Sequence, residues 1–275
     1  MHSILSREQL APAVVRFWIQ APAVARNCRA GQFVIIRLHD AGERIPLTIA
    51  DSNRADGTIA IVVQAVGKTT RELNAMQPGQ AILDVAGPLG QPTHIVPGLR
   101  LCCVGGGIGT AVVLPIARAV VRAGGHVTAI LGARTRDLII LEDDVRALAE
   151  TTIVTTDDGS YGMKGLVTEA LRDLLIRERE WIDEVVAVGP LPMMRAVCDV
   201  TRKFEVKTVV SLNPVMVDGT GMCGGCRVTV GGEQKFVCVD GPEFDGHQVD
   251  FGELMARLGA YREQELVAAE RAGAR

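Results

Sequence analysis

The sequence lacks several features by which common classes of protein are recognised. Its 29 Lys and Arg are balanced by 32 Asp and Glu, and no basic stripe stands out, so we expect no nucleic-acid partner. The longest apolar runs, such as the one around residues 111–121, are broken by Pro115 and Arg118, so no segment is expected to span a bilayer. No charged segment followed by an apolar run opens the chain, so we expect no signal peptide and a cytoplasmic location.

Internal repeats and low-complexity stretches are also absent, and only 4% of the residues are aromatic. The chain has instead many apolar side chains and 30 glycines in 275 residues. This composition is typical of an α/β protein. The length is enough for two domains and a small appendage.

The first hundred residues alternate apolar and polar positions in short runs that are separated by turn residues. Five such runs are expected to be strands, at residues 13–21, 32–40, 46–51, 58–66 and 81–87. Several short strands at this spacing favour a small antiparallel β-barrel. Pro97 and Gly98 suit a domain boundary, so the barrel domain is expected to cover residues 1–97.

From Leu99 onward, strands alternate with helices. Strands are expected at 99–105, 126–133, 151–159, 183–190 and 208–213, and helices at 109–124, 140–150, 165–179 and 191–204. This alternation predicts a parallel sheet of the nucleotide-binding type over residues 98–212. The remainder, 213–275, is expected to hold a cysteine-rich loop and a C-terminal helix over 250–272, whose apolar stripe includes Phe251 and Tyr261.

A glycine run, VGGGIGTA at 104–111, lies between an expected strand and an expected helix. Its members Gly105, Gly106, Gly107, Gly109 and Thr110 would let the backbone and the helix N-terminus approach the pyrophosphate of a dinucleotide. A tight strand–helix turn without a ligand is the alternative. The acidic residue that often follows about twenty positions later to bind a ribose hydroxyl is missing. Arg134 and Arg136 follow the next strand instead, so the choice between NADH and NADPH stays open.

Two segments of the barrel suit a flavin. One contains Arg44, Pro46, Leu47 and Thr48, where a strand presents backbone and a hydroxyl group beside an arginine. The other contains Gly67, Thr69 and Thr70 at the start of a helical stretch, where a diphosphate could meet the helix N-terminus. The alternative for the second segment is that a threonine only caps the helix.

The most specific pattern is D-x4-C-x2-C-x11-C, formed by Asp218, Cys223, Cys226 and Cys238. Plant-type [2Fe–2S] proteins bind their cluster with C-x4-C-x2-C and a later cysteine. Glycines surround these positions, as a loop around a cluster needs. The pattern therefore predicts a [2Fe–2S] site with Asp218 as an oxygen ligand, although Asp-Gly is also an ordinary turn pair.

A zinc site and a disulfide are the alternatives for these cysteines, and both fit less well. A zinc site would need four soft or imidazole ligands, and no second Cys pair follows; His247 alone is near enough in sequence to replace Asp218 or to join the set. A disulfide does not suit an odd cysteine count in a chain of intracellular character. The other four cysteines share no ligand spacing and are expected to pack in the core; they are Cys28, Cys102, Cys103 and Cys198.

Over almost its full length the chain resembles the ferredoxin–NADP reductase superfamily, and within it the iron–sulfur flavoproteins that include the electron-transfer subunit of dihydroorotate dehydrogenase B. It is most similar to the small (alpha) subunits of NADH-dependent reduced ferredoxin:NADP oxidoreductases, also described as sulfide dehydrogenase subunits. In the dihydroorotate relatives a cysteine stands where this chain has Asp218. The segments that carry the resemblance are RIPLTIAD, VGKTTREL, GPLG, VGGGIGTA, LGARTRDLIILEDD, TTDDGSYGMKGLVTEAL, GPLPMM, NPVMVDGTGMCGGCRV and FVCVDGPEFDGH.

The resemblance implies an oxidoreductase that takes NADH and contains FAD and a [2Fe–2S] cluster, with no general acid or nucleophile of its own. It assigns the flavin ring region to Arg44, Pro46, Leu47 and Thr48, and the flavin diphosphate to Gly67, Thr69 and Thr70. It assigns NAD(H) to the segment Gly105 to Thr110 and the cluster to Asp218 and the three cysteines. One departure concerns Arg44, which stands four positions before Thr48, whereas the superfamily motif has its arginine three positions before the hydroxyl residue.

The resemblance also implies a larger partner subunit, similar to the small subunit of glutamate synthase, with its own FAD and [4Fe–4S] clusters. Such a pair bifurcates electrons between NAD, NADP and ferredoxin. Two alternatives stay open. The chain could serve a dihydroorotate dehydrogenase or hydrogenase-type complex with the same cofactors, or it could be a non-catalytic nucleotide sensor whose cysteines bind zinc.

Overall fold

The computed structural model describes residues 1–259, 264 and 267. The chain forms two compact units. The first comprises Met1–Gln91, Asn213–Asp240 and the segment that starts at Asp250; the second comprises Pro92–Leu212 and Gly241–Val249. The expected division into domains at residues 97 and 212 stays a prediction.

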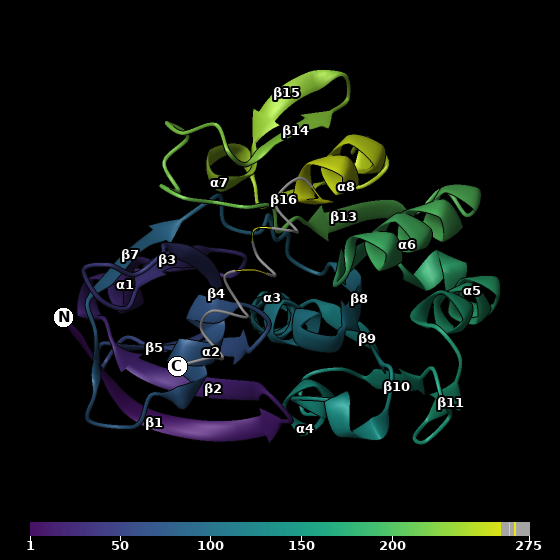
Figure 1. The fold of residues 1–275 in the computed structure, drawn as a ribbon. Coiled ribbons are helices and arrows are strands. Elements are labelled where there is room, and N and C mark those ends of the chain that lie inside the picture. Colours follow the sequence, from purple (N-terminus) through teal and green to yellow (C-terminus); the bar gives the residue numbers. More distant parts are fainter. Residues whose placement is uncertain (260–263, 265–266, 268–275) are drawn as a thin grey trace. The chain divides into compact units, whose positions relative to one another are not determined.

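The first unit contains a seven-stranded sheet in the order β6-β1-β2-β5-β4-β3-β7 (Figure 1). All of its neighbouring strands are antiparallel. The edge strands β6 and β7 are consecutive in the chain and only Leu83 separates them, so the sheet curls into a nearly closed barrel. The predicted antiparallel barrel is therefore confirmed. Its strands are β1 (His2–Ala11), β2 (Val14–Gln20), β3 (Phe33–Arg37), β4 (Ile45–Asn53), β5 (Thr58–Gln64), β6 (Ala81–Ile82) and β7 (Asp84–Leu89).

Alternating side chains of these strands fill the barrel. Phe17 and Ile19 on β2 meet Ile59 and Ile61 on β5 in one apolar cluster, and each is fully buried. Two short helices, α1 (Pro22–Asn27) and α2 (Lys68–Ala75), contribute Val24 and Leu73 among others to the core. Burying side chains of this size stabilises the fold by about 1.5–3 kcal/mol each.

The second unit is built on a mixed sheet in the order β11-β10-β9-β8-β12-β13-β16. Every pair is parallel except β13 with β16. The order reverses between β8 and β12, which makes a topological switch point, where doubly wound folds bind ligands. The strands are β8 (Arg100–Gly106), β9 (His126–Ala133), β10 (Thr151–Thr156), β11 (Met163–Lys164), β12 (Glu184–Val188), β13 (Lys207–Ser211) and β16 (Glu243–Asp245).

Helices cover this sheet. Helix α3 packs against β8, β9 and β12 and touches α4 (Figure 1). Helices α5 and α6 pack against each other, α5 also against β9 and β10, and α6 against β12 and β13. The predicted nucleotide-binding architecture is therefore confirmed. The helices are α3 (Thr110–Arg122), α4 (Glu142–Arg146), α5 (Val167–Glu178) and α6 (Leu191–Lys203), with short 3-10 turns η1 (Gly107–Gly109), η2 (Arg136–Leu138) and η3 (Arg179–Trp181).

The cysteine-rich segment leaves the sheet after β13 and returns as β16, which pairs with β13. In between it forms the hairpin β14 (Arg227–Val230) and β15 (Glu233–Phe236) and the short helix α7 (Val237–Asp240). Helix α8 (Phe251–Gly259) follows and packs against β14 (Figure 1). The predicted C-terminal helix extends to residue 272, and its part beyond Gly259, including Tyr261, lies outside the described residues apart from 264 and 267. Among the residues that the structure describes, none forms a helix long and apolar enough to cross a membrane.

Candidate functional site

The glycine run occupies the turn from β8 into α3, at the switch point of the sheet. A Cβ on Gly109 would lie 2.1 Å from the backbone oxygen of Val188 at the end of β12, so only glycine allows the start of α3 to approach this strand end so closely. Gly107 has a positive φ of 55° and faces open space. Free backbone beside the N-terminus of α3 is the arrangement that a pyrophosphate needs.

A second turn, from β12 into α6, borders the glycine run. A Cβ on Gly189 would lie 3.2 Å from the Cα of Gly106, and a Cβ on Gly106 would lie 2.3 Å from the Sδ of Met193. Met193 therefore packs directly on the glycine run. The sequence marks the GPLPMM segment as a strand end but does not predict this contact, because a packing partner across a switch point leaves no local pattern.

The ends of β9 and β10 carry the arginines that the sequence left open. Arg134 and Arg136 follow β9, and both are exposed. The guanidinium of Arg136 lies 5.2 Å from the ring centre of Tyr161, a cation–π distance. Its backbone N–H donates to the Ser160 hydroxyl at 2.9 Å.

In the barrel, β4 carries the first flavin segment. Ile45 and Leu47 pack against the barrel core, so alternation turns Pro46 and Thr48 to the outer face. Leu47 can therefore offer a ligand only its backbone. The neighbouring strand β3 pairs with β4 residue by residue, with Ile35 opposite Pro46.

The second flavin segment forms the N-terminus of α2. The Thr70 hydroxyl accepts the backbone N–H groups of Val66 at 3.0 Å and Gly67 at 2.9 Å, so Thr70 stabilises the helix start. The N-cap position itself belongs to Gly67. Thr69 is buried and its hydroxyl donates to Glu43 at 2.6 Å. Thr70 therefore shapes the loop at the start of α2, whereas the Thr69 hydroxyl is bonded to Glu43 and is not free to bind a ligand in this loop.

Asp218 is the best-organised acid of the cysteine loop. Its carboxylate accepts the backbone N–H of Thr220 at 2.9 Å and that of Cys223 at 2.7 Å. These N–H groups, Thr220 first, hold the pKa of Asp218 below its ordinary value, because they stabilise the charged form. The carboxylate is thus ionised and held next to Cys223, as an oxygen ligand must be.

Cys226 and Cys238 form a second pair in the same loop. Both side chains are buried, and the Cys238 N–H lies 3.4 Å from the Cys226 sulfur. Burial, followed by the contact with Cys226, raises the pKa of the Cys238 thiol to about 12. The free thiol is therefore protonated at neutral pH and must lose its proton when it binds a metal. Cys223, in contrast, is exposed, and its sulfur accepts the Gly225 N–H at 3.5 Å.

These donors fit a two-iron cluster better than a single ion. Within the described part of the chain, no three His, Cys, Asp or Glu side chains converge on one metal-sized point. A [2Fe–2S] cluster divides its ligands between two irons, so two adjacent pairs, Asp218 with Cys223 and Cys226 with Cys238, suffice. Backbone N–H groups directed at sulfur are typical of such clusters.

His247, the other nitrogen donor near in sequence, is engaged elsewhere. Its Nε2 lies 2.9 Å from the Thr201 hydroxyl of α6, in the second compact unit. The remaining four cysteines, Cys28, Cys102, Cys103 and Cys198, are all buried. Burial raises the pKa of the Cys102 and Cys198 thiols to about 12, which suits inert packing.

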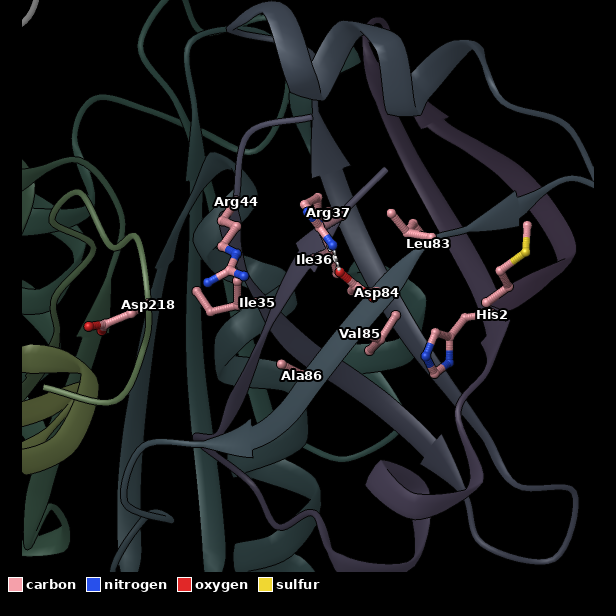
Figure 2. Close-up of a pocket in the computed structure, with 11 residues that line it drawn as sticks. His2, Ile35, Ile36, Arg37, Arg44, Leu83, Asp84, Val85, Ala86 and Asp218 are labelled. Carbon is pink, nitrogen blue, oxygen red and sulfur yellow. Dashed lines mark hydrogen bonds and ion pairs between the residues drawn. The ribbon is translucent and has the colours of Figure 1, made fainter. Parts of the chain in front are cut away.

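A cavity of about 330 Å³ connects the barrel with the cysteine loop (Figure 2). Its lining includes Ile35 on β3, Ala86 on β7, Arg44 and Asp218. Gly219, with a φ of 75°, places its Cα against Ile35, because a Cβ there would lie 2.8 Å from that side chain. Ile35 on β3 thus lies beside Pro46 of β4 and also contacts the cysteine loop, and no sequence motif marks it.

Three protein families match the chain. Residues 2–94 match the oxidoreductase FAD-binding domain, residues 103–199 the oxidoreductase NAD-binding domain, and residues 213–250 the iron–sulfur cluster binding domain of dihydroorotate dehydrogenase B. Fold and matches together define an oxidoreductase of the ferredoxin reductase-like class with FAD-, NAD- and iron–sulfur-binding domains.

Relatives narrow the class. A Thermotoga maritima protein described as a dihydroorotate dehydrogenase B (NAD(+)) electron transfer subunit homolog is 51% identical over 271 residues, which are 98% of this chain and 95% of that protein. The corresponding subunit of Geobacillus thermodenitrificans is 34% identical, covering 90% and 96%. A solved structure of the NADH-dependent reduced ferredoxin-NADP oxidoreductase superposes with a TM-score of 0.92 at 51% identity, covering 98% and 97%. The chain belongs to the family of dihydroorotate dehydrogenase B electron transfer subunits and their homologues.

Proposed function

We propose that this electron-transfer subunit passes electrons between NAD(H) and a larger partner subunit, by way of FAD on the barrel and a [2Fe–2S] cluster in the cysteine loop. One observation carries the proposal. The strand with Pro46 and Thr48 is hydrogen-bonded to the strand with Ile35, and the cysteine loop packs on Ile35 at Gly219. The two candidate redox sites are therefore neighbours within one compact unit.

When bound, a flavin exchanges a hydride with nicotinamide and single electrons with iron–sulfur clusters, which joins two-electron to one-electron chemistry. The chain's own residues hold and orient the groups. The outer face of β4, with Pro46 and Thr48, would hold the ring region of FAD. The backbone at Gly67 and the N-terminus of α2, shaped by Thr70, would hold its diphosphate.

The NAD(H) pyrophosphate would lie on the glycine run. Gly105, Gly106, Gly107 and Gly109 supply bare backbone, and Thr110 begins the helix whose N-terminus faces the anion. The close packing of Gly106 and Gly109 against the β12 end fixes the shape of this loop before any ligand arrives. A preformed loop lowers the entropy lost on binding.

The cluster would take Asp218 and Cys223 as one pair of ligands and Cys226 and Cys238 as the other. The two backbone N–H groups on Asp218 keep its carboxylate ionised and oriented, so the oxygen donor is ready before metal binds. The identity of residue 218 also bears on which partner subunit is expected. The resemblance implies a cysteine at this position in dihydroorotate dehydrogenase relatives, which supports the NADH-dependent reduced ferredoxin:NADP oxidoreductase assignment, with a larger flavin and [4Fe–4S] subunit and electron bifurcation in the complex.

The first experiment uses the whole chain, purified without oxygen. We expect released FAD after denaturation, two irons and two acid-labile sulfides per chain for one [2Fe–2S] cluster, and NADH-driven reduction of an artificial acceptor. A colourless protein with bound zinc would instead support the nucleotide sensor. Absence of flavin would reject the proposal.

The second experiment identifies the partner. We expect affinity purification from the native cell to bring down one larger subunit that contains flavin and [4Fe–4S] clusters. Recovery of a dihydroorotate dehydrogenase or hydrogenase subunit would decide for the alternative complex. Asp218→Cys, which introduces the cysteine of the dihydroorotate pattern, is the control: we expect the same partner, whereas a changed partner would mean that this ligand itself selects it.

A further inference from the structure

The end of β9 lacks the acid that often binds a ribose hydroxyl in doubly wound folds. Strand β9 lies beside β8, which ends in the glycine run, so the adenosine ribose of a dinucleotide on that run is expected near the β9 end. Ala133 ends the strand and Arg134 follows, and neither side chain can accept a hydrogen bond from a hydroxyl group.

The neighbouring strand supplies the missing acid. Beyond the end of β10, the Asp157 N–H donates to the Ala133 carbonyl at 3.1 Å and the Asp158 N–H donates to the Arg134 carbonyl at 3.2 Å. These two bonds hold the turn after β10 against the end of β9. They place two carboxylates beside the β9 end, at a distance in sequence that no motif search around the glycine run would cover.

Asp158 is the better ordered of the two. Its Oδ1 accepts the Ser160 N–H at 2.9 Å and the Ser160 hydroxyl at 2.7 Å. The side chain is nevertheless exposed, so a ligand can reach it. The opposing charges are Arg134 and Arg136, and the second of these is held against the Tyr161 ring.

We propose that Asp158 is a specificity-determining residue that selects NAD(H) over NADP(H), by accepting a hydrogen bond from the adenosine ribose and repelling a 2′-phosphate. The inference rests on the proposed NAD(H) site and adds its discriminating group. Two arginines alone would favour the phosphate of NADPH, but Asp157 and Asp158 match them charge for charge. A phosphate dianion then gains no net attraction and meets a carboxylate at close range.

The test compares kcat/KM for NADH and NADPH in the whole protein with an artificial acceptor. Asp158→Asn keeps an oxygen for both Ser160 bonds, removes the charge and puts an amide NH2 group in place of the second oxygen. We expect the NADH preference to fall about tenfold, mainly through a lower KM for NADPH, as expected for about 1.4 kcal/mol of lost repulsion. Asp173→Asn on α5 removes the same charge from an exposed site and is expected to leave the preference unchanged.

Binding of NAD+ and NADP+ to the oxidised protein, followed by flavin absorbance, gives an independent measure. A wild-type protein that prefers NADPH, or an equal change in the Asp158 and Asp173 variants, would overturn the inference while the electron-transfer function stands. A wild-type protein that neither coenzyme reduces would reject the proposed function itself, and the inference with it.

Discussion

Asp218 combines two properties in one half-buried loop carboxylate. It is held by backbone N–H groups from Thr220 and Cys223, which lower its pKa, and it stands next to three thiols with cluster spacing. Either property alone would describe a turn. Together they are the basis for proposing Asp218 as a cluster ligand, and substitutions at this residue distinguish a ligand from a turn residue.

Asp218→Cys is expected to keep the [2Fe–2S] cluster, because C-x4-C-x2-C with a later cysteine is a known spacing. Its visible and paramagnetic resonance spectra should shift, since sulfur replaces oxygen on one iron. Asp218→Asn is expected to lose iron, because a neutral amide is a poor ligand. The control is Asp240→Asn in the same lobe, where the carboxylate accepts the Phe236 N–H at 2.6 Å. Wild-type spectra and full iron in both Asp218 variants would remove this residue from the ligand set.

Arg44 lines the same cavity as Asp218. The other arginine of the cavity, Arg37, is paired with Asp84 at 2.6 Å, whereas Arg44 is exposed on the side towards the Asp218 loop (Figure 2). A positive charge there favours the added electron of a reduced cluster. Arg44→Gln is therefore expected to lower the cluster midpoint potential in a redox titration, and Arg44→Lys to restore it. Equal shifts in Arg37→Gln would contradict this role for Arg44.

At the scale of elements, the turn between β8 and α3 is the most constrained part of the nucleotide domain. Gly109→Ala would force a methyl group to within 2.1 Å of the Val188 oxygen, where only backbone can move. We expect a loss of about 2–4 kcal/mol in the free energy of unfolding, measured by urea denaturation, together with weaker NAD+ binding. Gly107→Ala in the same turn meets no neighbour and strains only its φ of 55°, so it should cost about 1 kcal/mol. Equal losses would argue against close packing as the cause.

The elements also mark the limits of what the sequence predicts. Strong periodicity predicts a helix at 191–204, and the structure has α6 at Leu191–Lys203. The sequence does not predict strand β1, because only Ile4 and Ala11 of its ten residues are buried and the apolar alternation is missing. The hairpin β14–β15 and strand β16 are short, and their formation depends on partners far along the chain.

The candidate site divides in the same way. The cysteine spacing and the glycine run are local patterns, and the sequence alone locates the loop and the strand–helix turn that carry them. The contribution of Ile35, Met193 and Asp158 comes from neighbours across a sheet or a turn. Strand order determines such contacts, and a single sequence does not encode that order in any local pattern.

At the scale of the whole molecule, one buried carboxyl group is expected to make the free energy of unfolding depend on pH. Glu243 on β16 is mostly buried and accepts the Thr93 hydroxyl at 2.6 Å. Burial raises its pKa most, the Thr93 bond lowers it and the charge of Glu184 raises it, and the net result is a rise from 4.5 to about 7. A raised pKa means that the folded chain binds the proton more tightly, so the contribution is full below pH 4.5 and is lost as the pH rises towards 7.

Glu243→Gln keeps an acceptor for Thr93 and removes the charge. We expect the variant to gain up to about 3 kcal/mol over wild type when the pH is raised from about 4.5 to about 8, measured by urea unfolding at both values. Glu233→Gln on the exposed hairpin should follow the wild-type curve. Parallel curves for wild type and Glu243→Gln would exclude this residue as the source of the pH dependence.

The cysteine-rich segment leaves and re-enters the sheet at one place. The Leu212 N–H donates to the Pro242 carbonyl at 2.9 Å, and β13 and β16 pair next to it, so the two ends of the excursion are clamped together. The entropy of closing a loop grows only with the logarithm of its length. The cysteine-rich segment can therefore change in length or be replaced as a unit during evolution, while the strands β13 and β16 keep their register.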